Sequence, residues 1–265
     1  MGLAFCTIAS AGAVSAQGIW DDPAFSLYRQ AVEAMDRKDY GRASDLSGQA
    51  IAQQPTHVLA YYLRGQAAMF QSRWDDAAAS FGKAVELYPG SFAGHRDLGG
   101  AFEQLNRPDD AAREYEAALA LRDQDDLHMR LAFLLLKANP PARALPHLQT
   151  LADRDSKAPE VWSALGRAAY EKSDLPVAEK NFTRAAALRD DGRAWFNLGV
   201  VRTRLNDLPG ALQAFEKAAG HDETRVPAQK EVAKVREAMK QPTAGSPDRV
   251  MPGGTPGQPL PSRRY

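Results

Sequence analysis

The sequence predicts an all-α protein in which short helix–turn–helix units follow one another along the chain. A tryptophan is followed by Leu-Gly three and four residues later, then by Ala, Phe and Ala at helical spacings, first from Trp162 and again from Trp195. The two copies lie 33 residues apart with every offset kept. A fixed period of this length indicates a repeat architecture, in which each unit packs mainly on its neighbours.

Aligning the whole chain on this period gives six units. They are expected at residues 24–57, 58–91, 92–124, 125–158, 159–191 and 192–225. The fourth unit is the weakest, since Leu131, Ala132, Ala144 and Leu148 keep the register but no glycine or aromatic residue marks it.

Each unit is expected to hold two helices. The first carries large apolar residues and a small residue, such as Gly166 or Gly199, that lets the second helix approach closely. The second presents Ala, aromatic and Ala at spacings of four and three, which is one face of an α-helix. Asp-Leu-Pro at Asp174 and at Asp207 predicts helix starts, because an acidic residue and a proline both suit a helix N-terminus.

These residues resemble tetratricopeptide repeats (TPR), the 34-residue helix–turn–helix units that stack into a right-handed superhelix. The resemblance covers about 200 of the 265 residues, an extent typical of solenoid proteins. Sel1-like repeats are the nearest alternative, but their unit is longer. The pattern is specific for a fold and says little about a function.

The two ends of the chain differ from the repeats. Residues 1–16 are uncharged and apolar, and Val14-Ser15-Ala16 resembles the end of a secretory signal peptide cut after Ala16. No Lys or Arg lies near Met1, so either the start codon lies upstream or the stretch is no signal. Residues 17–23 form a lead-in, 226–240 a capping helix, and 241–265 a Pro/Gly-rich tail expected to be disordered.

Composition and motifs limit the classes of partner, cofactor and reaction that the sequence can support. The net charge is 0, which gives no reason to expect nucleic acid as a partner. Cys6 is the only cysteine, and the five histidines are scattered without metal-ligand spacing, so we expect neither metal nor cofactor. No phosphate loop, dinucleotide fingerprint or nucleophile elbow is present, so the sequence predicts no enzyme and no small-molecule substrate.

The resemblance implies a concave face lined by the second, fifth, ninth, twelfth and thirteenth residues of each first helix. We add two residues from the sixth place, Arg130 and Asn197. The partner-binding residues predicted in this way are Tyr28, Tyr62, Gln66, Met69, Arg96, Glu103, Arg130, Lys137, Arg167, Tyr170, Arg193, Phe196, Asn197 and Arg204. Aromatic residues combined with arginine are typical anchors of protein interfaces.

The sequence thus predicts a non-enzymatic scaffold that binds a peptide or helix of a protein partner. If the signal is real, the protein acts in the bacterial periplasm or at the cell envelope, where peripheral association is allowed. Two alternatives stay open: a cytoplasmic TPR adaptor or co-chaperone, and a self-assembling structural repeat protein. The paired Lys and Asn that clamp the carboxylate of heat-shock chaperones in some TPR proteins are absent, and only Asn197 matches part of that pattern.

Overall fold

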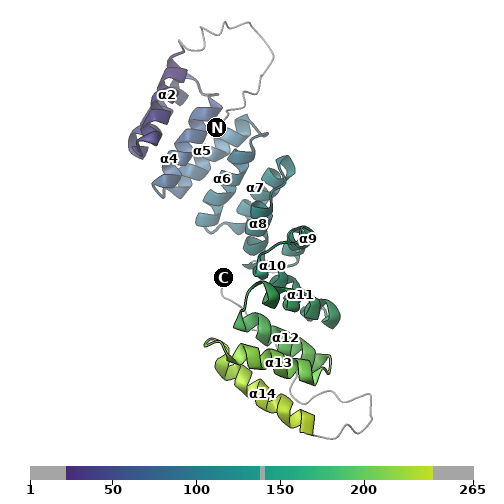
Figure 1. Ribbon diagram of the computed structural model, residues 1–265. Helices are drawn as coiled ribbons and strands as arrows, with labels where there is room; N and C mark the ends of the chain where they lie inside the picture. Colours follow the sequence, from purple (N-terminus) through teal and green to yellow (C-terminus); the bar gives the residue numbers. More distant parts are fainter. Residues whose placement is uncertain (1–21, 138–140, 241–265) are drawn as a thin grey trace. The chain divides into compact units, whose positions relative to one another are not determined.

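A computed structural model describes residues 22–137 and 141–240 of the chain. Over these ranges the secondary structure is thirteen α-helices and one short 3-10 helix, with no strand (Figure 1). The predicted all-α architecture of consecutive helix pairs is therefore confirmed. The predicted signal peptide and disordered tail lie outside the described residues, as does the lead-in up to residue 21.

The chain divides into two compact units, one ending at Gln124 and the other beginning at Asp125. Unit 1 holds three helix pairs, in which each helix packs on the next along the chain. They are α2 (Pro23–Asp36) with α3 (Tyr40–Gln53), α4 (Val58–Phe70) with α5 (Trp74–Leu87), and α6 (Phe92–Gln104) with α7 (Pro108–Leu121).

Unit 2 holds three further pairs and a final helix that packs on α13. They are α8 (Asp125–Lys137) with η1 (Pro141–Ala144) and α9 (Leu145–Asp153), α10 (Pro159–Glu171) with α11 (Leu175–Leu188), α12 (Gly192–Arg204) with α13 (Leu208–Ala219), and then α14 (Arg225–Lys240). On α14, Ala228 and Val235 are buried and most other side chains are exposed, which suits a helix that covers the end of an array.

The helix starts predicted at the two Asp-Leu-Pro sequences are confirmed. The Asp174 carboxylate accepts a hydrogen bond from the Val177 backbone N–H at 3.3 Å, and Asp207 accepts one from Gly210 at 3.0 Å. A side-chain acceptor at this place satisfies an N–H group that the helix itself leaves unpaired.

A glycine on the first helix faces an aromatic ring on the second helix in four of the six pairs. A Cβ atom added to the glycine would lie 2.6 Å from the ring of Phe81 at Gly65, 2.6 Å from Tyr115 at Gly99, 2.9 Å from Phe182 at Gly166, and 2.7 Å from Phe215 at Gly199. All four rings are buried. The glycine therefore makes room for the aromatic ring of the second helix.

Two pairs use smaller residues at these positions. In the fourth pair Ala132 and Leu148 replace glycine and the aromatic residue, and both are buried. In the first pair the corresponding residues are Ala31 and Ser47, also buried. Within the described residues the Ser47 hydroxyl has no hydrogen-bond partner. The first helix pair of each unit is therefore the atypical one.

The turn inside five of the pairs ends in a left-handed residue. These residues are Lys38, Ser72, Asn106, Ser173 and Asn206, with φ between 55° and 61°. After each left-handed residue, the next N–H bonds back into the first helix, as Asp39 does to the Ala34 carbonyl at 2.9 Å. This hydrogen bond caps the C-terminus of the first helix, and the left-handed residue reverses the chain direction within a short turn.

Candidate protein-binding faces

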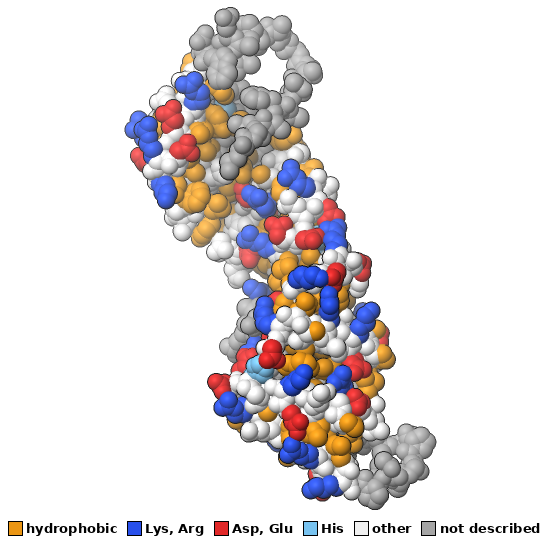
Figure 2. Space-filling view, in the orientation of Figure 1, with side chains coloured by type: hydrophobic (Ala, Val, Ile, Leu, Met, Phe, Trp, Pro, Cys, Tyr) orange, Lys and Arg blue, Asp and Glu red, His pale blue; other side chains and the backbone are white. Residues whose placement is uncertain are grey.

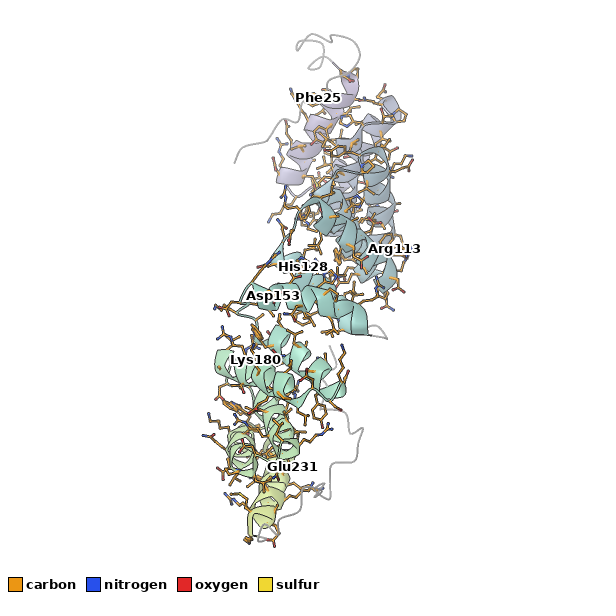
Figure 3. The ribbon with its side chains drawn as sticks, turned by 90° about the vertical axis from the view of Figure 1, so that its right-hand side faces the viewer. Phe25, Arg113, His128, Asp153, Lys180 and Glu231 are labelled. Carbon is orange, nitrogen blue, oxygen red and sulfur yellow. The ribbon has the colours of Figure 1, made fainter. Side chains whose placement is uncertain are left out.

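The exposed side of the first helices of unit 1 carries aromatic and methionine side chains. We call it the unit 1 face; it comprises Phe25, Tyr28, Val32, Met35, Leu59, Tyr62, Gln66, Met69, Phe70, Arg96 and Glu103. Phe25, labelled in Figure 3, lies with its ring centroid 6.2 Å from that of Tyr28. The Tyr28 ring in turn lies 5.3 Å from the His57 ring at the start of α4, so α2 and α4 are joined along this face. Burial raises the pKa of Tyr28.

Tyr62 and Arg96 meet at a carboxylate that sequence reasoning did not single out. The Tyr62 hydroxyl donates to Asp97 Oδ2 at 2.6 Å, and Arg96 Nε donates to Asp97 Oδ1 at 2.8 Å. Burial, followed by the hydrogen bond to Asp97, raises the pKa of Tyr62, so the phenol stays neutral. The carboxylate thus orients two of the predicted binding residues on neighbouring helices.

Two apolar side chains of this face remain more than half exposed. Leu59 is 52% and Phe70 56% exposed, and the Phe70 ring stacks on Tyr40 with centroids 4.8 Å apart. Figure 2 shows hydrophobic side chains gathered over the α2–α4 part of unit 1. Exposed apolar patches on soluble proteins commonly mark interaction sites.

The other predicted residues of unit 1 are partly committed to packing. Tyr62 and Met69 pack against the buried cluster around Phe81. Glu103 accepts a hydrogen bond from the buried Tyr115 hydroxyl at 2.9 Å, and Gln66 is half-buried. These side chains present only part of their surface to a partner.

The corresponding side of unit 2 carries arginine where unit 1 carries apolar residues. We call it the unit 2 face; it comprises Arg130, Lys137, Arg167, Tyr170, Arg193, Phe196, Asn197 and Arg204. The Arg204 guanidinium lies 4.8 Å from the centroid of the Tyr170 ring, which joins α12 to α10. Phe196 is half-buried, and its ring makes an edge contact with Phe215 at 5.4 Å.

Two residues of the unit 2 face are not freely exposed side chains. Arg193 forms an ion pair with Glu223 at 2.8 Å, so part of its charge is already compensated. Asn197 is only 4% exposed, and its Oδ1 has no hydrogen-bond partner among the described residues. A buried acceptor without a donor is costly, and its burial means that Asn197 contributes packing rather than exposed surface to this face.

The two tryptophans that marked the repeats are not part of either face. Each contacts the loop before its own helix and a cation on the following helix. Trp195 Nε1 donates to Asp190 at 2.6 Å, and the Lys217 ammonium lies 3.9 Å from the indole centroid. His221 completes the group at 3.4 Å from Asp190, beside a cavity of about 510 Å³. The indole hydrogen bond lowers the pKa of Asp190. Trp162 makes equivalent contacts: its Nε1 donates to the Ser156 carbonyl, and Arg184 lies over its ring. Because the arrangement recurs in two pairs, we interpret it as structural.

In the third and fourth pairs, the position that Trp162 and Trp195 hold in the fifth and sixth pairs is occupied by histidine. His95 Nδ1 lies 2.7 Å from Glu114, and His128 Nδ1, on α8, lies 2.9 Å from His147 Nδ1 (Figure 3). Within residues 22–137 and 141–240, no group of three or more His, Cys, Asp or Glu residues is placed to hold a metal ion. In the same part of the chain, no helix combines the length and apolarity needed to cross a bilayer.

Sequence reasoning missed Asp97, which holds two residues of the unit 1 face, and Met35, which belongs to that face. Asp97 lies one repeat and one residue after Tyr62, and an acid at that offset is the signal that could have found it. Met35 lies one 34-residue period before Met69, packed at the edge of the α2–α3 core. The periodicity alone would have placed Met35 beside the residues that we selected.

Helix pairs of this length, closed by glycine and aromatic residues at a fixed period, define a helical-repeat protein. The tetratricopeptide repeat family model matches residues 64–126, 129–191 and 164–225. These segments cover more than half of the chain, which therefore belongs to the tetratricopeptide repeat family.

Comparison with solved structures shows the same fold. YrrB, described as a TPR protein with an unusual peptide-binding site, is 21% identical; the match covers 75% of this chain and 100% of YrrB, with a TM-score of 0.56. The complex of Naa15/Naa10 bound to HypK-THB contains a chain that is 19% identical, with a TM-score of 0.54; the match covers 82% of this chain and 36% of that one.

Two curated relatives share part of the sequence. The chain is 29% identical over 122 residues to the general transcriptional corepressor ssn6 of Schizosaccharomyces pombe, which covers 44% of this chain and 11% of that protein. It is 26% identical over 104 residues to the DnaJ protein P58IPK homolog A of Oryza sativa subsp. japonica, which covers 39% of this chain and 22% of that protein. The chain thus spans less than a quarter of the length of either relative.

Proposed function

We propose that this protein is a non-enzymatic scaffold whose first-helix faces hold a peptide or helical segment of a partner protein. The observation that carries the proposal is the exposure of large apolar side chains on first helices, outside the buried cores, above all Leu59 and Phe70. Exposed apolar patches commonly mark interaction sites, and aromatic side chains are enriched in protein interfaces. The description of YrrB as a peptide-binding TPR protein supports the same use of the fold.

The side chains of α10 and α12 support a peptide as the bound group on unit 2, whereas the Oδ1 of Asn197 is buried and out of reach of a surface ligand. Tyr170 and Arg204, which lie against each other on α10 and α12, offer an aromatic surface and a cation beside a bound chain.

The place of action that fits the N-terminal sequence is the bacterial periplasm or cell envelope, in the assembly or secretion of envelope components. The support is Val14-Ser15-Ala16, which resembles a signal-peptidase site after an uncharged apolar stretch. Mass spectrometry of the native protein tests this directly. A chain that begins at Gln17 supports export, whereas one that keeps Met1 in the cytoplasm favours a cytoplasmic adaptor.

Site-specific photo-crosslinking in native cells tests the binding role. A crosslinking residue replaces Gln66 on α4 or Arg204 on α12, and matched controls replace the exposed Glu86 on α5 or Lys180 on α11 (Figure 3). Crosslinks to a defined protein from the first-helix positions but not from the controls support the proposal. Crosslinks from the controls alone, or from none of the four positions, would contradict it.

Self-association is the second candidate, because the two units carry opposite net charges. Residues 22–124 hold 11 Lys and Arg against 15 Asp and Glu, a net charge of −4. Residues 125–240 hold 19 Lys and Arg against 16 Asp and Glu, a net charge of +3. If unlike units of two copies attract, the mass measured by light scattering should fall with added salt. A monomer at every salt concentration would exclude this role.

A further inference from the structure

The chemistry of the unit 1 face identifies the kind of partner that it fits. We propose that this face binds the apolar side of a basic amphipathic helix, with the Lys and Arg side chains at one end of that helix lying over the edge formed by the C-terminal ends of α2, α4 and α6. The inference rests on the proposed binding function and adds the chemical class of the partner of unit 1.

The apolar part of the argument comes from two neighbouring helices. On α2, Val32 and Met35 pack at the border of the α2–α3 core and keep part of their surface exposed. On α4, Leu59 and Phe70 are more than half exposed at the two ends of the helix, and Met69, next to Phe70, packs against the core around Phe81. The α2 and α4 helices are in contact, so these side chains form one apolar strip.

The dimensions of this strip suit a helix. Helices of 13 and 14 residues are about 20 Å long, so the strip matches the apolar side of a partner helix of about four turns. Methionine adapts its shape to different apolar side chains, and Met35 and Met69 occupy equivalent positions in successive repeats. Helices that dock on apolar surfaces use side chains at spacings of three and four residues.

The electrostatic part of the argument comes from the helix ends. A helix C-terminus carries a partial negative charge and favours nearby cations. None of α2, α4 and α6 has a basic residue in its last turn. Asp36 is the last residue of α2, and Glu103 lies in the last turn of α6.

The arginines that follow these helices are already paired with acids. Arg37 pairs with Glu33 at 4.0 Å, and Arg73 with Asp76 at 3.5 Å. Arg107 pairs with Asp110 at 2.6 Å. Each pair compensates one acid and one arginine, and Lys38 is a further exposed cation after α2, so the attraction for partner cations comes from the helix ends and from the net charge of −4 over residues 22–124. The stacked rings of Tyr40 and Phe70 lie at the same edge, and a ring face attracts a cation as well.

The first helices of unit 2 differ from those of unit 1 in the charge of their last turns. Those of unit 2 carry Lys137 in the last turn of α8 and Arg204 in the last turn of α12, where Arg202 is already paired with Glu179. A basic helix would meet like charges there, so the proposal assigns it to unit 1 alone.

The test uses the full chain and three fluorescein-labelled peptides of about 14 residues, a length that matches α2 and α4. The first contains leucine and lysine in a 3.6-residue pattern, the second replaces lysine with glutamate, and the third scrambles the leucine–lysine order. We expect the patterned leucine–lysine peptide to bind at least about tenfold more tightly than either of the others, a gap of about 1.4 kcal/mol. Its affinity should fall as salt rises, because part of the attraction is electrostatic.

Substitutions then locate the site. Leu59→Glu with Phe70→Glu should weaken binding of the leucine–lysine peptide by about tenfold or more, and both residues are exposed enough for the fold to survive. The matched control is Tyr88→Glu with Leu121→Glu, which changes two apolar residues of unit 1 that are 45% and 47% exposed and lie outside the face. A second control, Lys180→Glu, changes an exposed charge of unit 2 outside its binding face. Both controls should leave the affinity within about twofold.

Three outcomes would overturn the inference. The scrambled peptide binds as tightly as the patterned one, the glutamate peptide binds more tightly, or the Tyr88/Leu121 control loses as much affinity as the Leu59/Phe70 variant. None of these results bears on crosslinking from Gln66 or Arg204 in cells. A failed peptide test beside a positive crosslink would therefore reject the basic helix and keep the scaffold.

Discussion

Units 1 and 2 are built by the same packing and differ in what they expose. Phe81 in unit 1 and Phe215 in unit 2 each lie against a glycine, where an added Cβ atom would come within 2.6 and 2.7 Å of the ring. At the exposed first-helix positions, by contrast, unit 1 carries Leu59 and Phe70 where unit 2 carries Arg193 and Arg204. The comparison teaches that the repeat period specifies the fold, while the positions between the packing residues are left for recognition.

The largest expected effect tests whether the packing is equivalent in the two units. Phe81→Ala and Phe215→Ala should each reduce the free energy of unfolding by about 3–5 kcal/mol, because each removes a fully buried ring from between two helices. Chemical denaturation followed by circular dichroism measures both. A loss in one unit that is several times the loss in the other would break the comparison.

The next effect comes from the glycines. Gly199→Leu should cost about 1–3 kcal/mol or more, since even a Cβ atom would lie 2.7 Å from the Phe215 ring. Gly166→Leu should behave alike in the neighbouring pair. Gly82→Ala is the matched control: nothing lies within 4 Å of a Cβ at this position inside α5, so alanine should stabilise by about 0.5–1 kcal/mol. A Gly199→Leu variant that melts like the wild type would contradict this packing arrangement.

A smaller effect concerns the atypical first pair of unit 1. Ser47 lies where the other pairs have Phe, Tyr or Leu, and its buried hydroxyl has no partner among the described residues. Ser47→Ala should therefore stabilise by about 1 kcal/mol, because it removes a polar group that loses its hydration without gaining a hydrogen bond. Thermal melting of the two proteins at one pH measures the gain, and a destabilised Ser47→Ala protein would show that the hydroxyl is bonded after all.

The smallest effect is a pH dependence that belongs to unit 1. His57 caps α4 by accepting a hydrogen bond from the Ala60 N–H at 3.2 Å, which requires neutral Nδ1. Burial lowers the pKa of His57 below its usual value of about 6.5. Between the lowered pKa of the folded protein and about 6.5, the unfolded chain binds the proton more readily than the folded one. The stabilisation by neutral His57 is therefore fully present above about pH 6.5 and is lost as the pH falls below that value.

A variant isolates this contribution from the other histidines. His57→Asn keeps a capping side chain that does not titrate, so the difference in unfolding free energy between wild type and variant should shrink or reverse as the pH is lowered from 7 toward 5. A difference that stays constant over this range would show that His57 is not the titrating cap. The helix starts of α11, α12 and α13 in unit 2 are capped by the carboxylates of Asp174, Asp191 and Asp207 rather than by a histidine.

Most of the fold followed from spacing, because each marker residue has one packing role. Gly166 and Phe182 recur as Gly199 and Phe215 only if two helices cross at the same place, and the Asp-Leu-Pro starts at Asp174 and Asp207 follow from local capping. The fourth pair was recognised as weak, and the structure shows why: α9 is nine residues long and begins in a 3-10 turn. The predicted binding roles of the site residues stay predictions.

The repeat, its helix pairs and the positions left over for recognition all depend on residue spacing, so they can be read from the chain alone. Which of those positions are available depends on how the helices pack. Asp97 holds Tyr62 and Arg96 together across two helices, Arg193 is bound to Glu223, and Asn197 is buried. The physical reason is that hydrogen bonds, ion pairs and burial depend on distances between helices, and a pattern along one chain does not specify them.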